Sequence, residues 1–326
     1  MSIPTNLKRK MLVGVAVGGI VYLALSIYIG WEGLRLATSS FRWSFLPLLL
    51  ALSLVNYGVR YLKWHYYLNR LDVPLPPYDS LLVFLAGLMF SITPGKLGEV
   101  AKAYLVKARL GTRVSVVAPV VLAERLTDVA SLVVLSLWGA LVFEYGRSAV
   151  LAGAVLTAAG LGFVSSRRLV IGTLGRFSHL PRVGGNIERI ETAYGSAAKL
   201  LSPIPLAIAT ALSVLSWGAE CLAFALTFAG FGRSVEIGAA SFTYAVSTMV
   251  GALAMLPGGL GLTEASLTGL SQQLFGVGEG VAGMAAIIVR VCTLWFAVAV
   301  GALALALVGR RFEGVDLAEV KTGADN

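Results

Sequence analysis

Charged side chains are scarce in this sequence of 326 residues. They make up 13% of the chain, whereas hydrophobic residues make up 57%, and the mean hydropathy is +0.82. This composition excludes an ordinary soluble globular domain and indicates a membrane protein that crosses the bilayer several times. The net charge of +9 therefore indicates membrane orientation and contact with anionic lipid headgroups, and it does not favour nucleic-acid binding.

Cysteine and histidine are almost absent as well. Cys221 and Cys292 lie in apolar segments, and His65 and His179 have no neighbouring ligand types, so the sequence predicts no metal site. It also contains no nucleophile elbow, no P-loop and no dinucleotide-binding fingerprint. We therefore expect neither an enzyme nor a resident cofactor.

Two glycine turns interrupt the apolar sequence. The first, Thr93–Glu99, reads TPGKLGE, and the second, Leu256–Glu264, reads LPGGLGLTE. At membrane depth a Pro-Gly break is stable only where protein or water surrounds it, because its backbone groups lack helical partners. Paired breaks in the two halves of a membrane chain point to the central site of a transporter. The residues of these turns are Pro94, Gly95, Gly98, Pro257, Gly258, Gly259 and Gly261.

Six apolar segments are predicted to cross the bilayer, for which a helix needs roughly 20 apolar residues. These segments are 11–31, 45–64, 114–143, 150–164, 204–231 and 281–308. Two further apolar segments, 80–92 and 238–256, each stop at one of the glycine turns, and the first of them is too short to cross unaided.

The distribution of basic residues predicts the topology. Most of the 26 Lys and Arg residues fall at 8–10, 60–70, 96–113, 167–199 and from Arg310 onward, and the positive-inside tendency places these groups in the cytoplasm. The first broken segment must then enter the membrane from the cytoplasm and return to the cytoplasm. The second must enter from the outer side and return to that side. The sequence thus predicts an all-α polytopic membrane protein of the cell membrane, with six full transmembrane helices, two re-entrant helical hairpins in inverted repeats, and cytoplasmic termini. The alternative is eight ordinary spans with interfacial turns.

Four regions follow from this topology. Residues 1–166 form an N-terminal membrane half with its turn at 94–99, and 203–311 form a C-terminal membrane half with its turn at 257–264. Residues 167–202 are predicted to be a basic cytoplasmic connector that contains an amphipathic helix from Ile187. Residues 312–326 are predicted to be a disordered tail.

Ionisable residues inside apolar segments are functional candidates, because an unpaired charge in hydrocarbon is costly. Glu124 and Asp128 share one helix face, and Arg125 reaches Asp128 three residues away. This cluster needs a further cation, and Arg60, Lys63, Lys96, Lys102 and Arg290 are candidates. The alternative is an ion-pair network that only holds helices together. The predicted substrate path comprises Arg60, Lys96, Glu99, Lys102, Glu124, Arg125, Asp128, Glu264 and Arg290.

Glutamates follow both turns, and two roles are open for them. If a helix begins after each turn, its N-terminal N–H groups can hold a lipid phosphate, or Glu99 and Glu264 can simply cap it. A weaker candidate, Glu220, lies alone in a span. The aromatic and basic stretch from Arg60 to Tyr67 is best interpreted as an interfacial belt with snorkelling cations, and a headgroup gate is the alternative.

Several motifs of the chain together resemble those of a known family. They are Asn56 with Arg60-x-x-Lys63-Trp64, the two glycine turns with their glutamates, Glu124-Arg125-Leu126-x-Asp128, and Arg290. They are similar to the flippase-like membrane family named after the transmembrane region of lysylphosphatidylglycerol synthase. The resemblance implies two re-entrant segments and a free-standing membrane domain. It does not imply synthase activity, because the aminoacyl-transferring domain of the namesake is soluble and C-terminal and has no counterpart here. It also implies a glycosyltransferase or synthase as a candidate partner.

Three function hypotheses remain open. The first is a lipid translocase, a flippase or scramblase, that moves an anionic phospholipid or a lipid-linked sugar through a cavity between the inverted halves. The second is a small-solute or ion transporter, with proton coupling as one form. The third is an accessory subunit or enzyme of lipid headgroup modification. A lateral opening to lipid discriminates the first hypothesis from the second, and a homo-oligomer is compatible with all three.

Overall fold

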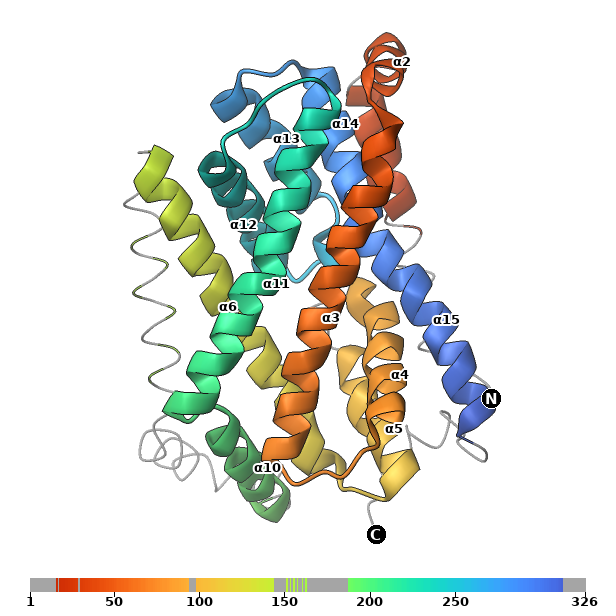
Figure 1. Ribbon diagram of the computed structural model, residues 1–326, viewed down its shortest axis with the longest axis vertical. Helices are drawn as coiled ribbons and strands as arrows, with labels where there is room; N and C mark the ends of the chain where they lie inside the picture. The colour runs from red at the N-terminus through yellow and green to blue at the C-terminus, as the bar shows by residue number, and fades with distance from the viewer. Residues whose placement is uncertain are drawn as a thin grey trace.

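A computed structural model describes residues 16, 18–28, 30–93, 98–143 and 187–312, together with six positions between 151 and 162. All regular secondary structure in this part of the chain is helical, which confirms the predicted all-α class (Figure 1). The described positions between 151 and 162 are helical too, in agreement with the predicted fourth span. Residues 1–15, 94–97, most of the connector and the tail lie outside the described residues, and so do the predictions made for them.

Three helical stretches are long and apolar enough to cross a membrane. The first is α3 (Leu46–Arg70) with the short turn η1 (Trp43–Phe45) before it, and the second is α11 (Pro203–Gly230). The third runs through α14 (Glu279–Arg290), the π-helical turn η5 (Val291–Trp295) and α15 (Phe296–Arg311) without a break. All three coincide with predicted spans, whereas the full count of six spans stays a prediction.

Helix α6 (Val114–Phe143) is as long as these spans but carries more charge. Its 30 residues extend about 45 Å at 1.5 Å per residue, which is enough to cross. Three charged residues lie near its middle, and Pro119 removes one hydrogen bond from its first third. The helix packs against α10 (Ile187–Leu200), α11 and α12 (Ile237–Leu253), so a large part of it lies inside the protein.

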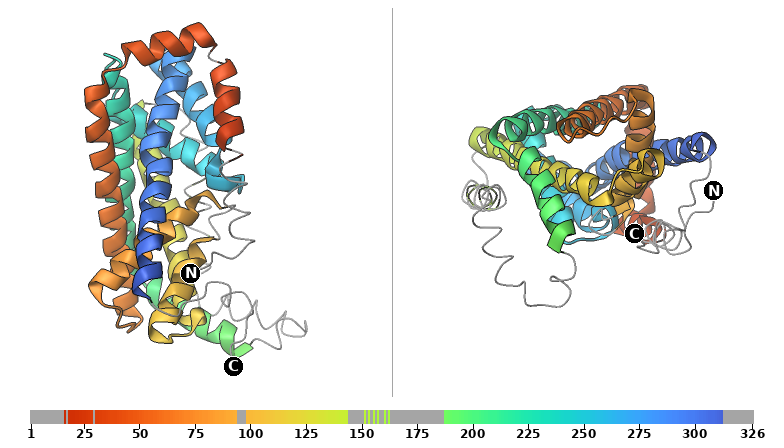
Figure 2. Two further views of the ribbon diagram at one scale, coloured as in Figure 1. Left: turned by 90° about the vertical axis from the view of Figure 1, so that its right-hand side faces the viewer. Right: turned by 90° about the horizontal axis from the view of Figure 1, so that it is seen from below.

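The N-terminal span differs from its prediction. A helix spans Gly18–Tyr28, and α2 (Trp31–Ser40) follows it at an angle of 97°. Gly30, the residue just before α2, has a φ of 73°. Figure 2 shows α2 lying across one end of the molecule. The sequence pattern predicted one straight span over 11–31 and no separate helix α2. Glycine adopts this left-handed conformation readily, so the bend needs no other cause.

Each broken segment forms a short apolar helix that stops at its turn. In the first half α4 (Pro77–Leu88) continues into η2 (Met89–Ile92), and α5 (Ala101–Leu110) follows the turn. In the second half α12 leads into η4 (Pro257–Gly259), and α13 (Leu262–Phe275) follows. Helices of this length are below the length of a full span. Figure 1 shows α4 and α5 in the lower half of the molecule and α12 and α13 in the upper half.

The two breaks meet inside the protein. A Cβ atom placed on Gly258 would lie 3.5 Å from the Cα atom of Ile92. Ile92, Leu260 and Leu294 form a small buried apolar cluster at this contact. On one side lies a core around Trp64 and Phe84, and on the other a core around Phe224 and Phe228. The breaks therefore meet between two cores, and both the N-terminal and the C-terminal part of the chain contribute residues to each core.

The connections into the two broken segments have the same local geometry. After α3 the backbone N–H of Val73 donates to the carbonyl of Leu68 over 3.1 Å, and after α11 that of Arg233 donates to Phe228 over 3.0 Å. The residue before each donor has a positive φ, 56° at Asp72 and 71° at Gly232. In each half the next helix begins four residues after the donor.

Polar contacts hold both ends of the bundle together. At the lower end the buried carboxylate of Asp79 accepts from Arg109 over 2.8 Å and from Arg311 over 2.6 Å, which links α4, α5 and α15. At the upper end the backbone N–H of Arg42 donates to the carbonyl of Gly230 over 2.9 Å. The hairpin α4–α5 is thus fixed to the C-terminal helix at its open end.

Candidate functional site

A buried polar face of α3 begins the site. Lys63 is 1% exposed and Trp64 is fully buried, while Asn56 on the same face donates to the carbonyl of Ser216 over 2.8 Å. The interpretation of this stretch as an interfacial belt with snorkelling cations is therefore wrong for Lys63. Arg60 and Tyr67 in this stretch of α3 are buried as well.

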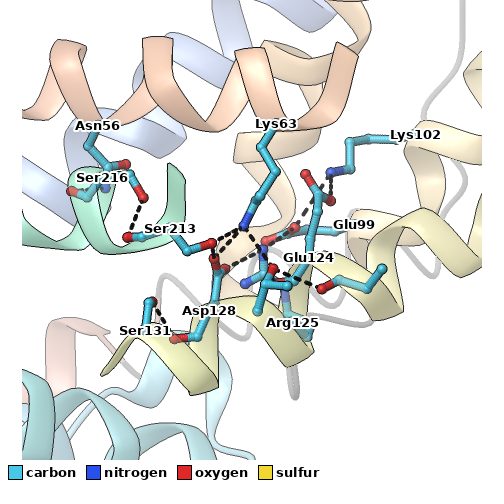
Figure 3. Close-up of polar contacts among 12 residues, drawn as sticks. Asn56, Lys63, Glu99, Lys102, Glu124, Arg125, Asp128, Ser131, Ser213 and Ser216 are labelled. Carbon is cyan, nitrogen blue, oxygen red and sulfur yellow. Dashed lines mark hydrogen bonds and ion pairs between the residues drawn. The ribbon is translucent and has the colours of Figure 1, made fainter. Parts of the chain in front are cut away.

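Lys63 supplies the cation that the α6 carboxylates need. Its Nζ lies 2.6 Å from Asp128 and donates over 2.6 Å to the hydroxyl of Ser213 on α11. Ser213 in turn donates to the same carboxylate over 3.2 Å. Figure 3 shows these side chains converging from three helices. The contact joins the N-terminal half to the first helix of the C-terminal half.

The remaining charges of this cluster come from α5, from the turn just before it, and from α6. Lys102 lies 2.5 Å from Glu124 and 3.9 Å from Glu99, and its ammonium is 4.5 Å from the centre of the Trp64 ring. The Nη2 atom of Arg125 lies 3.1 Å from Glu99 and 3.2 Å from Asp128. The predicted contact between Arg125 and Asp128 is therefore present.

We call these six charged residues the α6 network: Lys63, Glu99, Lys102, Glu124, Arg125 and Asp128. The three cations balance the three carboxylates, and all but Arg125 are nearly inaccessible to solvent. Breaking a buried pair costs about 3–5 kcal/mol when one partner is removed, because the other charge stays buried. The α6 network thus holds α3, α5, α6 and α11 together.

A second charged pair stabilises the turn between α12 and α13. Arg290 donates through Nε to Glu264 over 2.6 Å and through Nη2 to the carbonyl of Gly258 over 2.6 Å. The other oxygen of Glu264 accepts from the backbone N–H of Gly261 over 2.7 Å. Glu264 therefore caps α13, which is the second of the two roles considered for it, and it also pairs with Arg290. The N-terminal anion position of α13 is filled by the protein itself.

The two halves place this arginine–glutamate pair at the same sequence spacing. Glu99 and Arg125 are 26 residues apart, and so are Glu264 and Arg290. In each case the glutamate follows the break and the arginine lies on a long helix. The two parts of the chain therefore resemble each other in their charged residues as well as in the connections that follow α3 and α11.

The glycines of the second turn are required by its backbone. Gly258, Gly259 and Gly261 have φ values of 61°, 69° and 91°, a region that residues with a Cβ atom rarely adopt. In the first turn Gly98 donates its N–H to the hydroxyl of Thr93 over 2.9 Å, and a Cβ there would lie 2.7 Å from that oxygen. Pro94, Gly95 and Lys96 lie outside the described residues.

A small cavity of about 80 Å³ lies where the two breaks meet. Its lining includes Arg60 from α3, Ser91 from η2, Glu220 from α11 and Arg290 from α14. Glu220 accepts a hydrogen bond of 2.6 Å from the hydroxyl of Tyr244, which also lines the cavity. The cavity thus has charged residues in its lining and lies beside both breaks, where the paired breaks predict the central site.

Most of the predicted site residues fall into two groups. The α6 network contains Glu99, Lys102, Glu124, Arg125 and Asp128, and the second turn contains Glu264 and Arg290. Arg290 does not join the α6 network, and Arg60 forms no ion pair with any described residue. The predicted path omitted Lys63 and Ser213. The signal for Lys63 was its position seven residues after Asn56, which puts both on one helix face.

A larger groove of about 330 Å³ runs between the helix over 18–28 and α13. Its walls are mainly apolar, and they include Val21, Leu25 and Ala265. Glu264 and Gly261 lie at the wall it shares with the second turn. The groove thus connects an apolar surface with the charged pair at the break.

The described part of the chain holds no group of three His, Cys, Asp or Glu residues arranged to bind a metal ion. The carboxylates of the α6 network each face a cation. The site can therefore hold charge and donate hydrogen bonds.

Two comparisons relate the chain to known proteins. Residues 11–301 match the sequence profile of the lysylphosphatidylglycerol synthase TM region. A UPF0104 membrane protein of Methanothermobacter thermautotrophicus is 39% identical over 92 residues, which are 28% of this chain. This chain thus spans about a quarter, 27%, of that relative. Neither description states what a free-standing member transports.

Proposed function

This chain belongs to the lysylphosphatidylglycerol synthase TM region family, and from that premise and the site geometry we propose that it is a lipid translocase, a flippase or scramblase. Its substrate is a membrane lipid with a polar headgroup, either an anionic phospholipid or a lipid-linked sugar. The headgroup crosses at the meeting point of the two breaks while the acyl chains stay in the bilayer.

The groove between the helix over 18–28 and α13 is the observation that carries this proposal. An acyl chain fits its apolar walls, and the groove touches Glu264 at the second break. A transporter of water-soluble molecules needs no such apolar side entrance. The groove therefore favours a lipid substrate over the alternative, a small-solute or ion transporter.

The arrangement of the halves supports a transport mechanism by inverted repeats. The broken helices enter from opposite ends of the bundle, the connections after α3 and α11 match, and the arginine–glutamate spacing is the same. We propose that the halves rock against each other about the contact between η2 and η4, so that the cavity opens to alternate sides.

The basic residues favour one orientation in the membrane. Arg109 and Arg311 meet at Asp79 at the lower end of the bundle, where α3 also ends with Arg70. At the upper end lie the exposed Arg35 and Arg42. We propose that the lower end faces the cytoplasm of a cell membrane, with both termini on that side.

We propose a carrier and not an enzyme. Glu124 and Asp128 were the candidate general bases, but each is held by a lysine, Lys102 at 2.5 Å and Lys63 at 2.6 Å. Both carboxylates are thus engaged in ion pairs that hold helices of the protein together. The enzyme hypothesis would need product formation from purified protein and labelled lipid.

Reconstitution into liposomes tests the proposal. Vesicles with a fluorescent headgroup lipid are treated with a membrane-impermeant quencher, and the fraction of quenched lipid is followed in time. We expect the double variant Arg125→Ala, Glu264→Gln to flip lipid at least tenfold more slowly than wild type. Arg70→Gln, an exposed cation at the end of α3, is the matched control and keeps the wild-type rate. Equal rates for wild type and the double variant would count against the proposal.

A further inference from the structure

The cavity between the breaks contains one cation without a partner. Arg60 is 7% exposed, donates no hydrogen bond to the described residues and forms no ion pair with them. Its Nε atom is buried and unsatisfied. Every cation of the α6 network faces a carboxylate within 4.0 Å, and Arg290 faces Glu264 at 2.6 Å.

A buried guanidinium that forms no ion pair with the described residues is costly, since its charge is taken out of water. The cavity that Arg60 lines has room for several water molecules or for one tetrahedral oxyanion. The guanidinium is planar with its donors in a fork, a geometry that matches phosphate oxygens. The position therefore fits a residue that waits for an anion.

The other lining residues restrict the charge of that anion. Ser91 adds a hydroxyl group, and Glu220 adds a carboxylate that accepts a hydrogen bond from Tyr244. Arg290 also lines the cavity, but Glu264 already balances its charge. A negative charge on Glu220 repels a dianion more strongly than a monoanion. The cavity thus favours a singly charged oxyanion.

We infer that the cavity binds a singly charged tetrahedral phosphate group, with Arg60 as its anchor. This inference rests on the proposed function, because a phosphodiester in a lipid headgroup carries this charge and shape. Monoanionic inorganic phosphate offers the same chemistry without a lipid. The bound group pairs with Arg60 in the middle of the protein, and its release to either side follows from movement of the halves.

Binding by the purified full-length protein in detergent tests the inference. The probes are a short-chain phosphodiester lipid, its phosphate-free diacylglycerol counterpart and inorganic phosphate. Each is titrated by calorimetry at a mildly acidic pH, at which inorganic phosphate is mainly monoanionic. Wild type is expected to bind the phosphodiester lipid and not the diacylglycerol. Arg60→Gln is expected to weaken binding at least tenfold, and Arg60→Lys three- to tenfold, because lysine keeps the charge and loses the fork.

Two further variants make the result specific. Arg70→Gln removes a cation from the exposed end of the same helix and is expected to bind as wild type does. Thr248→Leu leaves every charge in place but fills the cavity, so it is expected to lose binding even if Arg60→Gln does not fold. Phosphodiester affinities of Arg60→Gln or Thr248→Leu within twofold of wild type would overturn the inference.

These experiments also distinguish a lipid headgroup from free phosphate as the source of the anion. They further distinguish failure of the anion site from failure of the proposed function. Arg60-dependent binding of inorganic phosphate with equal affinity supports the anion site and overturns the assignment to a lipid headgroup. If Arg60→Gln flips lipid at the wild-type rate, the inference fails and the translocase proposal stands. If wild type flips no lipid but phosphate binding depends on Arg60, the anion site stands and the translocase proposal fails.

Discussion

The first and second breaks carry an arginine–glutamate pair at the same spacing of 26 residues, yet the pairs have different surroundings. Arg125 reaches two carboxylates through one nitrogen atom, within a neutral network of six charges. Arg290 uses two nitrogen atoms for a carboxylate and a backbone carbonyl. The first pair therefore depends on charge, whereas the second depends on the shape of the guanidinium and fixes the turn directly.

Removing Lys63 should give the largest effect. Lys63→Met leaves Asp128 buried without its nearest cation, and we expect a loss of about 3–5 kcal/mol in stability. The measurement is thermal unfolding of the detergent-solubilised protein, with Arg70→Met as the exposed control on the same helix. Adding Asp128→Leu to Lys63→Met should restore most of the loss, because no unpaired charge remains. A single variant as stable as the control would show that the α6 network does not hold the helices.

Replacing each arginine by lysine should destabilise the protein more at the second break than at the first. Arg290→Lys cannot reach both Glu264 and the Gly258 carbonyl, and a lost bond to a charged group costs about 1.5–3 kcal/mol. Arg125→Lys keeps a point charge between its carboxylates, so we expect a cost below about 1 kcal/mol. Thermal unfolding and the lipid-flip rate are measured for both variants. Equal losses of stability would contradict the view that Arg125 acts through its charge and Arg290 through the shape of its guanidinium.

A glycine substitution in the second turn should cost less than Arg290→Lys. Gly259→Ala introduces a Cβ atom at a φ of 69° and 2.7 Å from the hydroxyl of Thr263, with a cost of about 1–2 kcal/mol. Gly218→Ala is the matched control, since that position lies within α11 and has no atom within 4 Å of a new Cβ. Helix propensity makes the control neutral or stabilising by up to about 1 kcal/mol.

These two glycine variants are compared by thermal unfolding at equal lipid and detergent content. A Gly259→Ala protein as stable as Gly218→Ala would mean that the backbone of the second turn tolerates a side chain. The turn would then be held by Arg290 and Glu264 alone. The two breaks would then differ in their electrostatic contacts and not in the backbone conformation that they require.

Much of the fold was accessible from local sequence. The lengths of the apolar runs predicted α3, α11 and α14–α15, and the Pro-Gly motifs predicted where α4 and α12 stop. The contact between Arg125 and Asp128 followed from their spacing on one helix. The bend at Gly30 and helix α2 were missed, because a single glycine before an amphipathic stretch is a weak local signal.

The partners of the charged residues were harder to predict from the sequence. Lys63, Lys102, Arg60 and Arg290 were equivalent candidates for the carboxylates of α6, and the structure pairs the first two with that cluster. Glu220 and Arg60 line one cavity although they are far apart in sequence. Such choices depend on which helix faces meet, and a spacing rule covers only one helix at a time.

The sequence by itself determined that the chain is a membrane protein, that two breaks interrupt it, and that its few internal charges must find partners. It did so because hydrocarbon penalises unpaired charge and unsatisfied backbone wherever they occur. Only the tertiary structure decided which charges pair and that Arg60 is left without a partner in the described protein. Coulomb attraction does not specify a partner, so helix packing made that choice.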